Sequence, residues 1–114
     1  MNKEDVAEVI GYFIEKYHTD TGKVELPVWD FTIKSIHGVK VSEESFKEFS
    51  TNLLTFEATA EIEKTDERST VLFKEPVILA GSADITPYIA IGTKEELPEV
   101  NFVTITQITT LKQS

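Results

Sequence analysis

Ten residues near the middle of the chain alternate between apolar and polar side chains without a break. One parity is wholly apolar: Leu54, Phe56, Ala58, Ala60 and Ile62. Since successive side chains of a β-strand point to opposite faces, residues 54–63 predict a strand with one dry face and one wet, acidic face. Such a strand is typical of an antiparallel sheet that is covered on one side only.

Residues 2–17 predict an amphipathic helix that covers the dry face. Its apolar side chains recur at the spacing of one helical stripe: Val6, Val9, Ile10, Phe13, Ile14 and Tyr17. Asn2 is a favourable cap, and Glu4 and Asp5 suit the positive end of the helix dipole.

Gly11 and His18 lead to two further predictions. Gly11 lies near the apolar stripe, where the missing side chain permits a close approach to the sheet. His18 follows the helix and is expected to be a cation near its last carbonyls. A metal-binding role is disfavoured, because no second histidine stands at ligand spacing.

A second extended segment covers residues 24–36. Pro27 places its start at an edge of the sheet. Trp29, Phe31 and Ile33 share one parity, which predicts that the only tryptophan lies on the dry face.

Residues 37–38, a His-Gly pair, predict a turn, and residues 42–49 predict a short second helix. Ser42 is a good helix cap, and Glu43 and Glu44 fill the first turn. The alternative for this segment is a loop without regular structure.

The alternating strand is joined to residues 69–74 by a short polar segment, which predicts a β-hairpin. Residues 75–76, a Glu-Pro pair, and the small residues 80–83 are expected to interrupt the chain that follows. Pro87 limits residues 84–92 to an edge position or a bulge.

The C-terminal part predicts one helical turn and a last strand. Residues 93–98 have the Thr-x-x-Glu form of a capping box, followed by proline. Residues 100–111 read as a strand whose apolar positions change parity between Ile105 and Ile108. An extra residue at 106–107 restores the register, so a β-bulge is expected there.

These elements predict a single α+β domain over residues 1–114. The N-terminal helix packs on a strongly bent antiparallel sheet of roughly four to six strands, with a short second helix. The element order resembles that of cystatin-like and cone-shaped helix-plus-sheet folds. This resemblance rests on element order alone and implies nothing about activity.

The charge and composition of the chain restrict the classes of partner that it is expected to bind. Lysine and arginine total 11 against 20 aspartates and glutamates, which gives a formal net charge of −9. Such a surface repels phosphate backbones and anionic lipids, so we expect no direct nucleic-acid or membrane partner. With no cysteine, disulfides and thiolate chemistry are excluded, and with no signal-like start a cytoplasmic location is expected.

No motif for catalysis, metal binding or phosphate binding stands out. The sequence has no glycine-rich phosphate loop, no spaced acidic calcium loop and no G-x-S-x-G turn. Most adjacent acid pairs open predicted helices, where the helix dipole explains them better than acid–base chemistry does. We therefore expect no cofactor, and a non-catalytic binding or regulatory protein.

The wet face of the alternating strand is the first candidate binding surface. Its polar residues form a regular row: Glu57, Thr59, Glu61 and Glu63. A flat acidic row of this kind suits a protein partner with a basic surface, or self-association as a homodimer. The alternative is a solvated face that serves only solubility.

The second hypothesis is a small-ligand-binding protein or enzyme with a cavity between helix and sheet. The polar-tipped residues available to line it are Tyr12, Tyr17, Trp29, His37 and Tyr88. The alternative is that the phenylalanines of the core fill this space.

Overall fold

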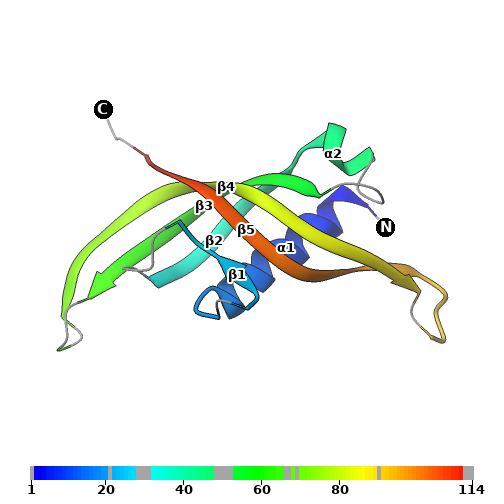
Figure 1. Ribbon diagram of the computed structural model, residues 1–114, viewed down its shortest axis with the longest axis horizontal. Helices are drawn as coiled ribbons and strands as arrows, with labels where there is room; N and C mark the ends of the chain where they lie inside the picture. Colours follow the sequence, from blue (N-terminus) through cyan, green and yellow to red (C-terminus); the bar gives the residue numbers. More distant parts are fainter. Residues whose placement is uncertain are drawn as a thin grey trace.

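The computed structural model describes residues 2–20, 22–27, 32–47, 53–65, 68, 70–89 and 91–111, with the backbone alone at residues 65 and 71–73. In this part of the chain one long helix packs on a five-stranded sheet of order β1-β5-β4-β3-β2 (Figure 1). The predicted α+β architecture is confirmed.

The long helix, α1 (Lys3–Tyr17), is capped as its sequence predicts. The side chain of Asn2 accepts a hydrogen bond of 2.7 Å from the backbone N–H of Asp5. Val6, Ile10 and Ile14 are fully buried against the sheet. A side chain at Gly11 would meet the methyl group of Val39 at 3.2 Å, so the expected close approach to the sheet is present.

The strands are β1 (Val24–Glu25), β2 (Thr32–Val41), β3 (Leu54–Thr65), β4 (Val71–Ile89) and β5 (Glu96–Thr110). Each neighbouring pair is antiparallel except β1, which pairs with β5 in parallel through two residues. The sheet is thus mixed, although antiparallel pairing dominates it. β4 and β5 are long and bent, and they run past the other strands at one end (Figure 1).

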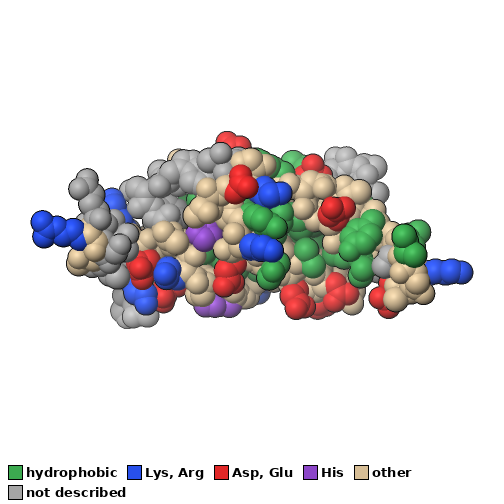
Figure 2. Space-filling model, turned by 90° about the horizontal axis from the view of Figure 1, so that it is seen from below, with side chains coloured by type: hydrophobic (Ala, Val, Ile, Leu, Met, Phe, Trp, Pro, Cys, Tyr) green, Lys and Arg blue, Asp and Glu red, His purple; other side chains and the backbone are tan. Residues whose placement is uncertain are grey.

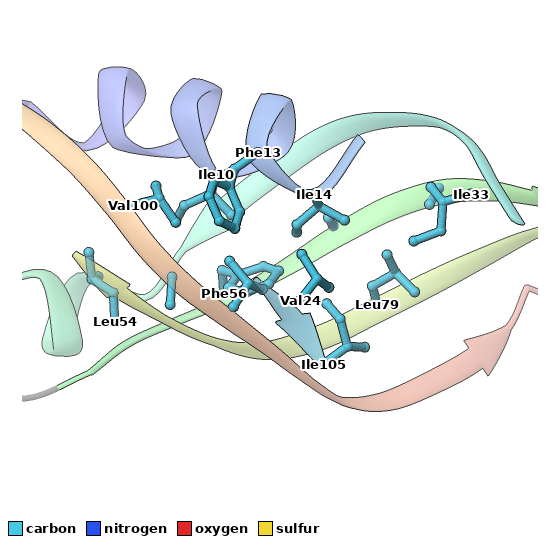
Figure 3. Close-up of a cluster of buried hydrophobic side chains, with 14 of the residues drawn as sticks. Ile10, Phe13, Ile14, Val24, Ile33, Leu54, Phe56, Leu79, Val100 and Ile105 are labelled. Atoms are coloured by element: carbon cyan, nitrogen blue, oxygen red, sulfur yellow. The ribbon is translucent and has the colours of Figure 1, made fainter. Parts of the chain in front are cut away.

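The alternating strand has the predicted orientation. Its apolar residues are at most 4% exposed, and they join the side chains of α1 in one core cluster (Figure 3). Glu57 on the opposite parity is exposed. Burial of these apolar side chains, worth about 25 cal/mol per Å² of apolar surface, holds the helix on this face.

The predicted turn at residues 37–38 is wrong. β2 continues through both residues, and the register against β3 shifts between His37 and Lys40. Gly38 has a φ of +65°, so the Gly signal belongs to a bulge inside a strand rather than to a turn between strands.

The short second helix is confirmed as α2 (Glu43–Lys47). The hydroxyl of Ser42 accepts a hydrogen bond of 3.4 Å from the N–H of Ser45, as expected of a cap. The end of the prediction, residues 48–49, lies outside the described residues, as does Trp29.

The two interruptions expected in β4 are also wrong. The strand passes through Pro76, whose carbonyl accepts a bond from the N–H of Leu111 at the end of β5. In an antiparallel sheet the N–H and C=O of one residue point to the same neighbouring strand, which for Pro76 is β5. Since β5 ends at Thr110, the N–H that proline lacks would point to a place where the pairing already stops.

Gly81 likewise lies inside β4 and not in a flexible break. An added side chain would overlap the carbonyl oxygen of Thr104 and lie 2.9 Å from the Cα of Ile105. The glycine therefore allows β5 to pass close to β4 at a register shift.

In β5 one prediction is confirmed and one is wrong. Ala80 pairs with Gln107 and Gly81 with Ile105, so Thr106 is the extra residue of the expected bulge. The predicted helical turn at residues 93–98 is absent, because β5 already begins at Glu96. The threonine of the supposed capping box instead accepts a bond from the N–H of Glu95 within a β-hairpin loop.

His18 occupies the expected position but is not the expected cation. Its Nδ1 donates to the carbonyls of Ile14 and Glu15 at 3.1 and 3.0 Å, and its Nε2 accepts from the N–H of Ile33 at 3.3 Å. A carbonyl only accepts and a backbone N–H only donates, so this arrangement fits the neutral ring with its proton on Nδ1. The buried ring thus joins the end of α1 to the edge of β2.

Candidate protein-binding surfaces

The predicted acidic row lies on the outer face of β3, opposite α1, but lysines of neighbouring strands accompany it. The Nζ of Lys74 is 3.3 Å from Glu61, and the Nζ of Lys34 is 3.9 Å from Glu63. Lys40 is the cross-strand neighbour of Glu57 on β2. The negative charge of this face is therefore largely offset, a consequence of strand pairing that periodicity alone does not reveal.

A groove of about 570 Å³ crosses this outer face next to Glu57. Its floor is low because residues 80–82 of β4 are Ala, Gly and Ser. Two of its hydroxyl groups are engaged internally: Thr55 donates to Ser45, and Thr106 donates to the carbonyl of Ala80. The groove is thus a product of the bulged, close-packed centre of the sheet.

The residues proposed to line a cavity face different surroundings. Tyr12 is 65% exposed, and Tyr17 is half-buried against Phe13. His37 pairs with Thr59 on the outer face, and Tyr88 lies near the far end of β4 with 45% exposure. The core cluster occupies the space between helix and sheet (Figure 3). A depression of about 430 Å³ lies between the start of α1 and β2, but Tyr12, Tyr17, His37 and Tyr88 do not line it.

The tyrosines of α1 instead interact with lysines. The Nζ of Lys16 lies 5.6 Å from the ring centre of Tyr12 and 5.3 Å from that of Tyr17. Tyr12 and then Tyr17 raise the pKa of the Lys16 ammonium above its ordinary value through charge interaction. These contacts gather Tyr12 and Tyr17 around the Lys16 ammonium near the C-terminal end of the helix.

A second surface is formed by the far ends of β4 and β5. The pairing of β3 with β4 ends at Ala83, whereas β4 continues to Ile89 with β5 as its described partner. Residues 84–89 of β4 and 96–102 of β5, with the loop between them, are called the ribbon below. The ribbon projects past the N-terminal end of α1 (Figure 1).

The ribbon exposes large apolar side chains. Ile89 is 68% exposed and Ile91 is fully exposed, beside the half-exposed Tyr88. Figure 2 shows hydrophobic and acidic side chains side by side toward this end of the molecule (right). Tyr88 and Ile89 lie on opposite faces of β4, and large exposed apolar side chains gathered at one end of a folded domain are characteristic of contact surfaces.

Carboxylates occur on the same two strands and loop, and Glu96 is the cross-strand partner of Ile89. The ribbon and its loop carry Asp84, Glu95, Glu96 and Glu99 against a single cation, Lys94. Among the residues that the structure describes, none of the four carboxylates has an ion-pair partner. The ribbon and its loop therefore carry an excess of negative charge that no described ion pair offsets.

Prolines occupy both free edges of the ribbon. Pro87 pairs with Pro98 across the two strands. Neither residue has an N–H, so a proline pair fits only where the backbone groups of both residues face outward from the ribbon. Each edge thus lacks one backbone N–H that an added strand would need as a hydrogen-bond donor. Prolines at exposed sheet edges commonly prevent strand addition in this way.

Sequence reasoning missed the ribbon as a binding surface. The available signal was the run of apolar residues at 88–91 between acidic residues, which breaks the alternation of a half-buried strand. Its exposure follows from where α1 and β3 begin, and these are properties of the tertiary structure.

Comparison with protein-family models, with characterised proteins and with solved structures found no match to this chain. In the described part of the chain, no three histidine, aspartate or glutamate side chains are grouped so as to hold a metal ion. None of the helices in that part has the length and apolar character needed to cross a membrane.

Proposed function

We propose that this protein is a non-catalytic binding protein that recognises a partner with a basic surface through the ribbon. The observation that supports this most strongly is the 68% exposure of Ile89 on a strand whose neighbouring apolar residue of the same parity, Ile85, is 8% exposed. The uncompensated carboxylates around Ile89 favour a basic partner.

The outer row of Glu57, Thr59, Glu61 and Glu63 is the second candidate surface for the same function. Its lysine neighbours reduce the attraction that it offers to a basic partner. The ribbon combines exposed apolar area with unpaired charge, and this combination is the better basis for affinity. A cytoplasmic location belongs to this proposal and rests on composition alone.

Two triple variants with the same change of charge separate the two surfaces. The ribbon variant carries Glu95→Lys, Glu96→Lys and Glu99→Lys, and the outer-row variant carries Glu57→Lys, Glu61→Lys and Glu63→Lys. Proteins captured from native extract by the wild-type chain are identified, produced separately, and measured for affinity at two salt concentrations.

The ribbon variant is expected to lose about tenfold or more in affinity for a basic partner, and the outer-row variant to retain it. Binding by the wild type should weaken with salt. If the ribbon variant keeps full affinity while the outer-row variant loses it, the row is the site. If both variants bind every captured protein as the wild type does, neither surface has the proposed function.

A further inference from the structure

We propose that the inner face of the ribbon is the docking site for a basic amphipathic helix of the partner. This inference rests on the proposed function, because it specifies which face of the ribbon binds and what kind of segment binds there.

The inner face of the ribbon continues the face that α1 covers. Ile85 and Val100 are paired across the ribbon and belong to the same buried cluster as Val6 and Ile10 of α1. Figure 3 shows Val100 beside Ile10. Because strand residues of one parity share a face, Ile89 continues this apolar surface toward the loop. α1 begins at Lys3, so its layer stops before this surface does.

The boundary between the covered and uncovered parts is visible at the start of α1. Asn2 and Asp5 line one small depression together with Glu95, Glu96 and Leu97 of the ribbon. The first turn of the helix therefore lies against the base of the loop, and the ribbon extends beyond it (Figure 1).

A helix suits the uncovered face better than a strand does. The covered part of the same face already accommodates a helix through apolar residues spaced four apart, Val6 and Ile10. Strand addition would require the free edges of the ribbon, and each edge lacks the N–H of a proline, Pro87 or Pro98.

The carboxylates near the inner face of the ribbon indicate that the docked helix is basic. Asp5 stands at the start of α1, and Glu96, the cross-strand partner of Ile89, and Glu95 in the adjoining loop have no ion-pair partner among the described residues. A second copy of this chain would bring like charges together at this face, which disfavours it as the occupant. A helix with one apolar stripe and lysine or arginine beside it matches both features.

Two synthetic probes of equal composition test the inference on the full chain. One peptide of leucine and lysine has leucines at helical spacing, and the other has them at strict alternation, which favours a strand. Each is titrated into the wild type, into Ile89→Ser on the inner face, and into the matched outer-face variant Tyr88→Ser. The ribbon variant with Glu95→Lys, Glu96→Lys and Glu99→Lys reports whether the ribbon is contacted at all.

The helical-period peptide is expected to bind the wild type more tightly than the alternating peptide. Ile89→Ser should weaken it about tenfold, and Tyr88→Ser by less than about twofold. Both substituted side chains are exposed, so thermal unfolding should show that each variant remains folded. Ile91→Ser in the loop next to Ile89 provides a second variant if Ile89→Ser does not fold.

Two contrary results are distinguishable. If the alternating peptide binds as tightly as the helical one, or Tyr88→Ser weakens binding as much as Ile89→Ser, the helix-docking inference is overturned while the ribbon remains the contact surface. If neither the serine variants nor the charge-reversed ribbon changes the affinity of either peptide, the inference and the proposed ribbon function fail together.

Discussion

The two halves of β4 have the same alternating character but different surroundings. Up to Ala83 the strand lies between β3 and β5, and beyond it the described partner is β5 alone. Leu79 in the first half is fully buried, whereas Ile89 in the second half is 68% exposed. Alternation therefore determines which face a side chain occupies, and the covering elements determine whether that face is dry.

Charge separates the same two regions. Beside the first half of β4, the glutamates of the outer row lie next to lysines of β2 and β4. In the ribbon that the second half forms with β5, four carboxylates stand against one lysine. A region that is both uncovered and charge-unbalanced is the region left available for a partner, and this contrast yields the predictions that follow.

Truncation of one apolar residue in each half should give the largest difference. Leu79→Ala removes a fully buried side chain and is expected to lower the free energy of unfolding by about 2–5 kcal/mol. Ile89→Ala should change it by less than about 0.5 kcal/mol, because little burial is lost. Equilibrium unfolding in urea measures both. Equal losses would show that the ribbon is covered in solution.

A side chain at the centre of the first half should be nearly as harmful. Gly81→Ala places a methyl group against the backbone of β5 and is expected to cost roughly 1–3 kcal/mol. The neighbouring Ser82→Ala adds no atoms and serves as the control, with a change near zero. A Gly81→Ala variant as stable as the wild type would refute the close contact of β4 with β5.

Removal of the histidine nitrogens should have an intermediate effect at the opposite edge of the sheet. His18→Phe keeps a ring but leaves the N–H of Ile33 without its acceptor, so the expected loss of stability is about 1–2 kcal/mol. Amide exchange should accelerate at Ile33 more than at Ile62, its neighbour on β3. Unchanged protection of Ile33 would contradict the assigned hydrogen bond.

An N–H restored to the free edge of the ribbon should alter association more than stability. Pro87→Val supplies the missing donor, and the variant is expected to self-associate at high protein concentration more than the wild type does. Sedimentation velocity measures the difference. Identical sedimentation at all concentrations would mean that the proline does not guard this edge.

The smallest effect is expected at the ion pair between α1 and α2. The hydrogen bond from Lys3, at 2.9 Å, lowers the pKa of the Glu43 carboxyl, so the charged form is favoured in the folded state. This contribution is present above the ordinary pKa of glutamate and is lost as the pH falls through the lowered value. Glu43→Gln should slightly reduce stability at neutral pH, with Glu44→Gln as the control. The two variants should become indistinguishable in acid.

Local patterns in the sequence correctly predicted the structural features that depend on a single helix or strand. The parity of residues 54–63, the stripe and cap of α1, and the bulge at Thr106 all follow from spacing along one segment. The turn at residues 37–38 and the break at Gly81 were wrong, because glycine marks a bulge or a close approach as readily as a chain reversal.

The candidate site depends on relations between segments that no local pattern contains. Lysines reach the outer row from β2 and β4, and β1 joins the sheet in parallel through two residues only. The exposure of Ile89 depends on α1 beginning at Lys3 and on β3 pairing no further than Ala83. The excess of carboxylates at residues 84–99 follows from the sequence, whereas their lack of ion-pair partners among the described residues follows only from the structure.

The central claim is that the inner face of the sheet is covered up to Ile85 and uncovered at Ile89. Isoleucine methyl NMR with a soluble paramagnetic agent tests this directly, because relaxation of each methyl group increases with its access to solvent. Strong enhancement is expected at Ile89 and Ile91, and weak enhancement at Ile62 and Ile85. Enhancement at Ile89 as weak as that at Ile85 would contradict the claim.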